Sequence, residues 1–164
     1  MSGEKLAGKK AIVSGGSRGI GRGIALTLAA EGADVAFCHY KDDENASQTV
    51  ADIEALGRKA FAADCDVSST SAIKDFYAAS VNSIGDIDIL VNNAGHNITE
   101  NFEDISEESF DRMLNVHVKG TFFMTQAVYR DMIKRGSGRI INITSQLAYK
   151  GAGELTHYSA AKGA

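Results

Sequence analysis

The sequence predicts an α/β fold in which a parallel, doubly wound sheet carries helices on both faces. Short apolar runs alternate with segments whose apolar residues recur every three or four positions, and a glycine cluster follows the first run. The alternation continues for more than a hundred residues, which indicates a parallel sheet that is buried on both faces. The length of 164 residues fits a single domain spanning residues 1–164.

Each expected strand is a short apolar run that ends at polar residues or glycine. The expected strands are residues 10–13, 32–38, 59–64, 87–91 and 139–144. The expected helices are residues 20–28, 46–57, 73–84 and 106–134, with a further helix around Tyr158. Ser68 or Ser69 is the expected N-cap of the third helix, because a serine hydroxyl can accept from first-turn N–H groups. The stripe of the longest helix that should face the core contains Phe110, Met113, Leu114, His117, Thr121 and Met124.

The glycine cluster after the first strand has the form of a phosphate-binding turn. Gly15, Gly19 and Gly21 make the pattern G-x-x-x-G-x-G between a strand and a helix. Glycine lets a phosphate approach bare backbone, and the helix that follows offers free N–H groups and its positive dipole end. The alternative is an ordinary loop, and the strand-turn-helix context favours a dinucleotide turn.

The residue near the end of the second strand indicates which dinucleotide would bind. An acidic residue about 20 positions after such a turn binds the ribose 2′-hydroxyl of NAD. Here that place falls near His39 and Tyr40, while Arg18 and Lys41 could meet a 2′-phosphate. The sequence therefore favours NADP(H). The alternative is that Arg18 and Lys41 are solvated surface residues that contact no cofactor.

Tyr158 and Lys162 stand four residues apart in an Ala-rich segment. On a helix such residues are neighbours, and an ammonium beside a phenol favours its phenolate form. This pairing is how a tyrosine can serve as a general acid and base near neutral pH. The alternative is an incidental pair at the end of a surface helix.

Other polar residues follow expected strands. Gly15, Asp66 and Asn93 should meet at the carboxyl edge of the sheet, where ligands bind in such folds. The fifth strand delivers Ser145 to the same edge. Asn115 lies within the long helix, and a polar helix residue of this kind commonly faces solvent.

The composition narrows the class of protein. The formal net charge is −4, from 17 basic and 21 acidic residues without long runs of one sign, which argues against a nucleic-acid surface. The chain has neither a long apolar run nor the layout of a signal peptide, so we expect a cytoplasmic protein with no membrane contact. Cys38 and Cys65 are too few for a disulfide framework, and they show no clustering typical of metal ligands.

Taken together, these motifs resemble those of the classical short-chain dehydrogenase/reductase family over the whole chain. The matching segments are Ser14-Gly15 through Gly21, Asp66-Val67, Asn92-Asn93-Ala94-Gly95, Asn115, Ser145 and Tyr158-Ser159-Ala160-Ala161-Lys162. Ser14 departs mildly from the threonine that is common in the family. The resemblance implies a Rossmann-type sheet of strand order 3-2-1-4-5 that lacks the usual last strands. It also implies that the chain is truncated after the Tyr-x-x-x-Lys motif. The full-length protein would assemble as a homodimer or homotetramer.

The resemblance also assigns roles. Asn115, Ser145, Tyr158 and Lys162 would form a catalytic tetrad in which Tyr158 exchanges the proton, and Ser145, Gln146 and Tyr158 would contact the substrate. Asn115 would bind a water that links Lys162 to solvent, a role that needs a break in the helix hydrogen bonding. The cofactor would contact Gly15, Ser17, Arg18, Gly19, Ile20, Gly21, His39, Tyr40, Lys41, Asp66, Val67, Asn93, Ala94, Gly95, Tyr158 and Lys162. Further candidates for the substrate pocket are His96, Asn97, Leu147 and Tyr149.

The expected function is an NADP(H)-dependent oxidoreductase that transfers hydride between nicotinamide and a carbonyl or secondary alcohol. Within the family, the chain looks most like members that reduce 3-oxoacyl-[acyl-carrier-protein], because its basic residues Arg18 and Lys41 are typical of NADP binding. A sugar, polyol or other alcohol dehydrogenase is the alternative within the family. A non-catalytic nucleotide-binding or dimerisation fragment is the alternative from another class, and no metal is expected.

Overall fold

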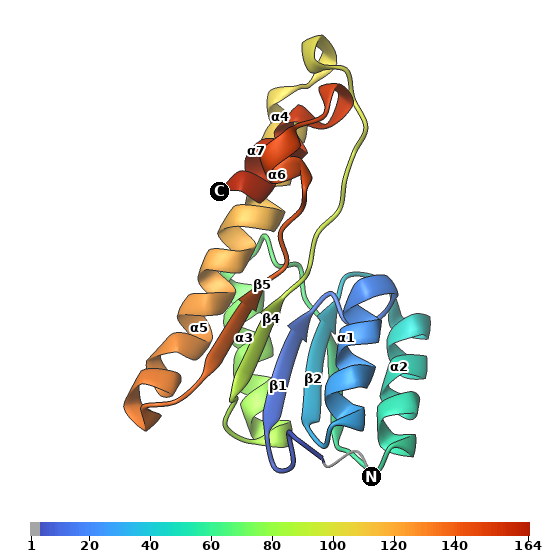
Figure 1. Cartoon of the computed structure of the whole chain (residues 1–164), viewed down its shortest axis with the longest axis vertical. Coiled ribbons are helices and arrows are strands. Elements are labelled where there is room, and N and C mark those ends of the chain that lie inside the picture. Colours follow the sequence, from blue (N-terminus) through green and yellow to red (C-terminus); the bar gives the residue numbers. More distant parts are fainter. Residues whose placement is uncertain (1–3) are drawn as a thin grey trace.

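A computed structural model of the chain describes residues 4–164. It contains one sheet of five parallel strands in the order β3-β2-β1-β4-β5 (Figure 1). The strands are β1 (Lys10–Ser14), β2 (Asp34–His39), β3 (Ala60–Asp64), β4 (Ile89–Asn92) and β5 (Arg139–Asn142). The predicted parallel sheet and its strand order are confirmed. The observed strands differ from the predicted ranges by at most two residues at either end.

Helices cover both faces of the sheet, as the doubly wound fold requires. On one face α1 (Gly19–Ala30) and α2 (Asp43–Ala55) pack against the sheet, and α3 (Thr70–Ile84) and α5 (Gly120–Arg135) pack on the other (Figure 1). Successive strand residues point to opposite faces, so Ala11 and Val13 face the first helix pair while Ile12 faces the second. All three side chains are fully buried, and the two cores share one sheet.

The N-cap of α3 resolves an alternative that the sequence left open. Ser69 occupies the N-cap, and its hydroxyl accepts a hydrogen bond from the N–H of Ala72 at 3.4 Å. Ser68 lies one residue earlier, and its N–H bonds to the Asp66 carboxylate at 2.9 Å. The loop between β3 and α3 is therefore closed by Asp66 and Ser69 together.

The predicted long helix is not continuous. It consists of α4 (Glu107–Leu114), a π-helical turn η2 (Asn115–Lys119) and α5, so the hydrogen-bonding break that the resemblance implied lies at Asn115. In this turn the N–H of Gly120 bonds to the carbonyl of Asn115, five residues earlier. Phe110 was predicted to face the core, but it is 40% exposed because α4 extends beyond the sheet.

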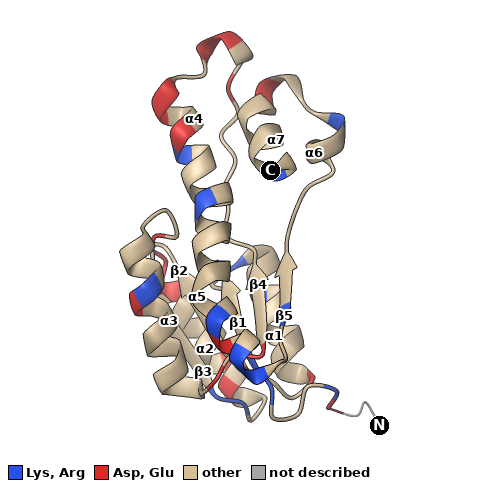
Figure 2. Cartoon of the chain, turned by 90° about the vertical axis from the view of Figure 1, so that its left-hand side faces the viewer, with Lys and Arg blue, Asp and Glu red and all other residues tan. Residues whose placement is uncertain are grey.

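The last elements lie above the carboxyl edge of the sheet, together with α4 (Figure 1). They are α6 (Leu147–Lys150), η3 (Gly153–Leu155) and α7 (Thr156–Gly163), and only the last of them was predicted. Acidic residues gather at the far end of this part, around η1 (Phe102–Asp104) and the start of α4 (Figure 2). Carboxylates in a first turn stabilise the helix N-terminus.

Candidate active site

A cavity of about 950 Å³ opens at the carboxyl edge of the sheet, beside β1, β2, β4 and α7. The predicted cofactor residues that line it are Gly15, Ser17, Arg18, Ile20, Gly21, His39, Tyr40, Asp66, Val67, Asn93, Ala94, Gly95, Tyr158 and Lys162. His96 and Asn97 line it as well. The predicted site residues outside its lining are Gly19, Lys41, Asn115, Ser145 and Gln146.

The Gly-rich turn brings backbone to the cavity floor. A Cβ at Gly21 would lie 1.9 Å from the carbonyl oxygen of Gly15, so only glycine fits there. Helix α1 begins at Gly19, and its N-cap Arg18 makes no side-chain capping bond. The N–H groups of the first turn therefore remain open to an anionic ligand.

Ser14 joins this turn to the end of β4. Its buried hydroxyl accepts hydrogen bonds from the N–H groups of Asn93 and Ala94, both at 3.0 Å. The Asn93 amide in turn donates to the carbonyls of Ser14 and Gly15, both at 3.1 Å. This reciprocal network fixes Asn93 between the two strand ends and leaves few polar groups there without a partner.

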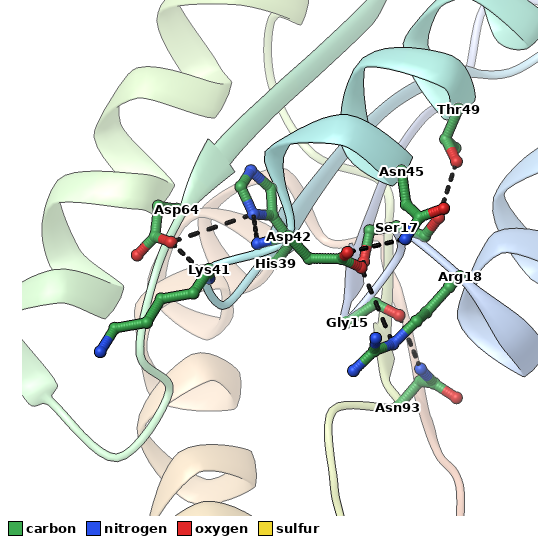
Figure 3. A network of polar contacts seen from close by, with 10 residues as sticks. All are labelled: Gly15, Ser17, Arg18, His39, Lys41, Asp42, Asn45, Thr49, Asp64 and Asn93. Carbon is green, nitrogen blue, oxygen red and sulfur yellow. Dashed lines mark hydrogen bonds and ion pairs between the residues drawn. The ribbon is translucent and has the colours of Figure 1, made fainter.

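Sequence reasoning missed Asp42, which lies next to the turn (Figure 3). Its carboxylate accepts from the Ser17 hydroxyl and the Asn45 amide, both at 2.7 Å, and lies 3.7 Å from Nε of Arg18. The hydrogen bonds from Ser17 and Asn45 hold the pKa of Asp42 below its usual value. Two consecutive aspartates just after β2 were the available sequence signal, but a count of about 20 residues pointed to His39.

His39 and Lys41 occupy different surroundings (Figure 3). The His39 ring is buried, and its Nδ1 accepts a hydrogen bond from the N–H of Asp42 at 3.3 Å. Lys41 has a positive φ of 50°, and its N–H bonds to the Asp64 carboxylate at 2.6 Å. The Lys41 ammonium lies 5.0 Å from the centroid of the Tyr40 ring and outside the cavity lining. Its placement therefore does not support the predicted contact with a 2′-phosphate.

Tyr158 and Lys162 both lie on α7, as predicted, and both line the cavity. The Lys162 ammonium donates to the carbonyl of Ile143 at 2.7 Å and lies 6.0 Å from the centroid of the Tyr158 ring. The Thr144 hydroxyl donates to the carbonyl of Lys162 at 2.9 Å, so the end of β5 holds the helix at two points. Burial lowers the pKa of the Lys162 ammonium.

Ser145 and Gln146 follow the same strand but lie just outside the cavity lining. The Ser145 hydroxyl accepts from the N–H of Leu147 at 3.1 Å, which starts α6. Tyr149 on that helix is 88% exposed and contributes nothing to the cavity wall. Thr144 and Ile143 line the cavity at this end instead.

Asn115 lies outside the lining of the main cavity, and its predicted role stays a prediction. It borders a separate hollow together with Glu107, Asp111 and Arg112, whereas His117 faces the main cavity. Residues two positions apart on a helix point to roughly opposite sides, so the side chains of Asn115 and His117 have different surroundings.

A family model described as short chain dehydrogenase matches residues 9–164. The chain belongs to the short-chain dehydrogenase family. A 2-dehydro-3-deoxy-D-gluconate 5-dehydrogenase of Bacillus subtilis is 42% identical over 157 residues, covering 96% of this chain and 61% of the relative. The 3-oxoacyl-[acyl-carrier-protein] reductase of Staphylococcus epidermidis is 36% identical over 154 residues, covering 94% of this chain and 63% of the relative.

Solved structures of other proteins share the fold of this chain. An NAD⁺-bound xylitol dehydrogenase matches with 34% identity and a TM-score of 0.92, over 97% of this chain and 61% of that one. A short chain dehydrogenase from Burkholderia cenocepacia in complex with NADP matches with 39% identity and a TM-score of 0.90, over 97% and 64%. The chain thus spans about three fifths of the length of the relatives it matches.

Two further observations bear on this short-chain dehydrogenase. Across residues 4–164, no group of three or more His, Cys, Asp or Glu side chains has an arrangement that could hold a metal ion. Among the described helices, none combines the length and the apolar character that a membrane span requires.

Proposed function

We propose that the protein carrying this chain transfers hydride between NADP(H) and a carbonyl or secondary alcohol, with Tyr158 as general acid and base. The observation that carries the proposal is the meeting of two motifs at one cavity. The Gly-rich turn lines one part of its wall, and the Tyr158–Lys162 pair lines another. We further propose that residues 1–164 act as one NAD(P)-binding domain.

The residues present fit a dinucleotide. The open N–H groups at the start of α1 and the cradle at Gly21 suit a pyrophosphate. Asp66 and Val67 would hold the adenine side, Asn93 to Gly95 the middle, and Tyr158 with Lys162 the nicotinamide ribose. When bound, the nicotinamide supplies or accepts the hydride.

The side chains around the carbonyl then have separate tasks. Tyr158 donates its proton to the carbonyl oxygen in the reduction and removes the hydroxyl proton in the oxidation. Ser145 donates a hydrogen bond to that oxygen, where negative charge develops. In the structure this hydroxyl accepts from the N–H of Leu147, which leaves its own proton free to be donated. Lys162 stabilises the phenolate form of Tyr158 by its positive charge.

The preference for NADP(H) depends on Arg18 and Asp42. The Asp42 carboxylate already accepts two hydrogen bonds, and Arg18 meets it only through Nε. The Arg18 side chain is 76% exposed, so its guanidinium fork can reach a 2′-phosphate at the cavity mouth. Arg18→Ala should weaken NADPH binding more than NADH binding, and Asp42→Asn should do the opposite. Tighter binding of NADH than of NADPH by the wild-type protein would overturn the preference.

Two substrate classes follow from the named relatives. The basic residues Arg18 and Lys41 favour a 3-oxoacyl thioester as substrate. The relative at 36% identity is named as a reductase of such a substrate. The sugar-acid dehydrogenase at 42% identity and the polar lining at His96 and Asn97 favour a polyhydroxylated substrate instead. Rates of NADPH oxidation with acetoacetyl thioesters and with keto-sugar acids, measured on the complete protein, would separate the two.

A second candidate function, a nucleotide-binding module without catalysis, predicts binding without turnover. Tyr158→Phe should abolish NADPH oxidation and leave NADPH affinity within about twofold, because it removes only the hydroxyl. Full activity in that variant would exclude the proposed mechanism. A wild-type protein that binds NADPH but consumes none with either substrate class would favour the binding module.

The assembly and the location complete the proposal. We expect a cytoplasmic homodimer or homotetramer, in keeping with two buried free thiols at Cys38 and Cys65. On α5, Phe122, Tyr129 and Ile133 are between 52% and 62% exposed, and an oligomer interface would cover them. Light scattering on the complete protein measures the assembly directly.

A further inference from the structure

The two cysteines of the chain lie at the carboxyl ends of the neighbouring strands β2 and β3. Cys38 pairs with Ala63 in the parallel register, and Cys65 follows the last residue of β3. The N–H of Cys65 bonds to the carbonyl of His39 at 2.8 Å, so the contact between the two strands continues up to this residue. Both cysteine side chains point to the face of the sheet that α3 and α5 cover, and both belong to the core on that face.

The two thiols share a hydrogen bond, which changes their pKa values in opposite directions. The bond from Cys65 lowers the pKa of the Cys38 thiol, and the backbone N–H of Gly15 lowers it further. The same bond, together with burial, raises the pKa of the Cys65 thiol. Cys38 is therefore the better nucleophile, and Cys65 keeps its proton beside it.

Both thiols are reached through the cavity. Cys38 and Cys65 are only 1% and 3% exposed, yet both belong to the cavity lining. Asp66 and Val67, which directly follow Cys65, line the cavity as well, and so does Gly15. A small solute inside the cavity would meet the two sulfurs, whereas a ligand that filled the cavity would cover them.

This arrangement differs from that of cysteines that only fill a core. A buried cysteine commonly acts as a small apolar side chain and stays inert. The thiols of Cys38 and Cys65 instead contact each other and border a cavity. Cysteines that respond to oxidants combine a stabilised thiolate with a neighbouring thiol that can resolve the first oxidation product. The pair has both properties.

We propose that Cys38 and Cys65 form a peroxide-sensitive dithiol whose oxidation to a disulfide blocks the cofactor site and whose reduction restores it. The Cys38 thiolate attacks one oxygen of hydrogen peroxide, the O–O bond breaks, and the departing hydroxide takes up the proton that Cys38 had released. Cys38 is then a sulfenic acid. The Cys65 sulfur attacks the Cys38 sulfur, the S–O bond breaks, and water leaves with the proton of the Cys65 thiol. The two steps oxidise two thiols and reduce one peroxide to two water molecules.

The disulfide would displace the loop that begins at Cys65. The Cα atoms of a disulfide stand about 4.4–6.8 Å apart, and Cys65 lies two residues beyond the register partner of Cys38, so the bond draws Cys65 toward β2. Asp66 follows directly, and its carboxylate and carbonyl hold the N–H groups of Ser68 and Ser69, both at 2.9 Å, so the loop moves with it. This loop carries the adenine side of the proposed cofactor site. Because the coupling is reciprocal, bound cofactor should oppose formation of the disulfide.

The first test maps the thiols of the complete protein after treatment with hydrogen peroxide. Trypsin releases residues 23–41 and 60–74 as separate peptides with one cysteine each, so a disulfide between them gives a cross-linked mass that dithiothreitol removes. We expect this cross-link in the protein without cofactor. With NADPH at about ten times its Kd it should form roughly tenfold more slowly, because only the free protein reacts. Absence of the cross-link, or an equal rate with NADPH bound, would overturn the proposal.

The second test uses two matched variants to separate the roles of the thiols. In Cys65→Ser the attacking thiol has no resolving partner, so dimedone should trap a sulfenic acid on Cys38, located by mass spectrometry. In Cys38→Ser, dimedone should leave Cys65 unlabelled. Peroxide should weaken NADPH binding by the wild-type protein roughly tenfold or more, with recovery in dithiothreitol, and Cys38→Ser should stay within about twofold of its own untreated affinity.

An equal loss of affinity in Cys38→Ser, or a dimedone label on Cys65 in place of Cys38, would contradict the assigned roles. The inference rests on the proposed function only in naming NADP(H) as the ligand that is excluded. A reduced wild-type protein that binds no NADPH would count against the proposed function. The peptide map needs no cofactor, and it would still decide whether the two thiols form a redox pair.

Discussion

Ser14 gives the sharpest test of how the two central strands hold the site. Ser14→Ala removes one buried oxygen and leaves the N–H groups of Asn93 and Ala94 without an acceptor, since both bond to that hydroxyl at 3.0 Å. An unsatisfied buried N–H costs about 1–3 kcal/mol, and one of the two can be partly rehydrated from the cavity. The expected loss in the free energy of unfolding is therefore about 2–4 kcal/mol.

Ser14→Thr is the matched control, because it keeps the hydroxyl and adds one methyl group. It should cost less than about 1.5 kcal/mol if the methyl is accommodated. Urea unfolding followed by circular dichroism measures both variants, and NADPH titration reports whether Asn93 still faces the cavity. A loss below about 1 kcal/mol in Ser14→Ala, or equal losses in the two variants, would refute the reasoning.

Two further predictions concern the turn and the far side of the sheet. Gly21→Ala should weaken NADPH binding by roughly tenfold or more, because its Cβ would lie 1.9 Å from the Gly15 carbonyl oxygen, whereas Gly23→Ala meets no atom within 4 Å and should bind normally. Equal affinities would contradict this. The Tyr77 hydroxyl donates to Asp131 at 2.7 Å and lowers the pKa of that carboxyl. The resulting stability is present above the unfolded pKa of about 3.8 and is lost as the pH falls through the lower folded value, so Tyr77→Phe should flatten the acid limb of the unfolding free energy. A limb as steep as that of the wild type would show that this pair does not contribute.

Much of the fold followed from local patterns. The five strands were predictable because each is a short apolar run, and their parallel pairing follows from the helices between them. Tyr158 and Lys162 were predictable because both lie within one helix, where a spacing of four has one geometric meaning. The Gly-rich turn was predictable for the same reason, because its glycines stand between a strand and a helix that are adjacent in the sequence.

Other parts depended on contacts that no local pattern contains. The π-helical turn could not be predicted from the spacing of apolar residues within 106–134. Asp42 was not predicted because its role depends on Ser17 in the Gly-rich turn and Asn45 in helix α2. The position of Lys41 also depends on its surroundings: its φ is positive, and its ammonium lies 5.0 Å from the centroid of the Tyr40 ring.

Transfer of deuterium tests the central claim most directly. The complete protein is given NADPH labelled at the transferable C4 position together with the better of the two substrate classes, and the product alcohol is examined by mass spectrometry and NMR. The wild-type protein should place one deuterium on the former carbonyl carbon, and Tyr158→Phe should place none despite near-normal NADPH binding. Unlabelled product from the wild type, or labelled product at the wild-type rate from Tyr158→Phe, would contradict it.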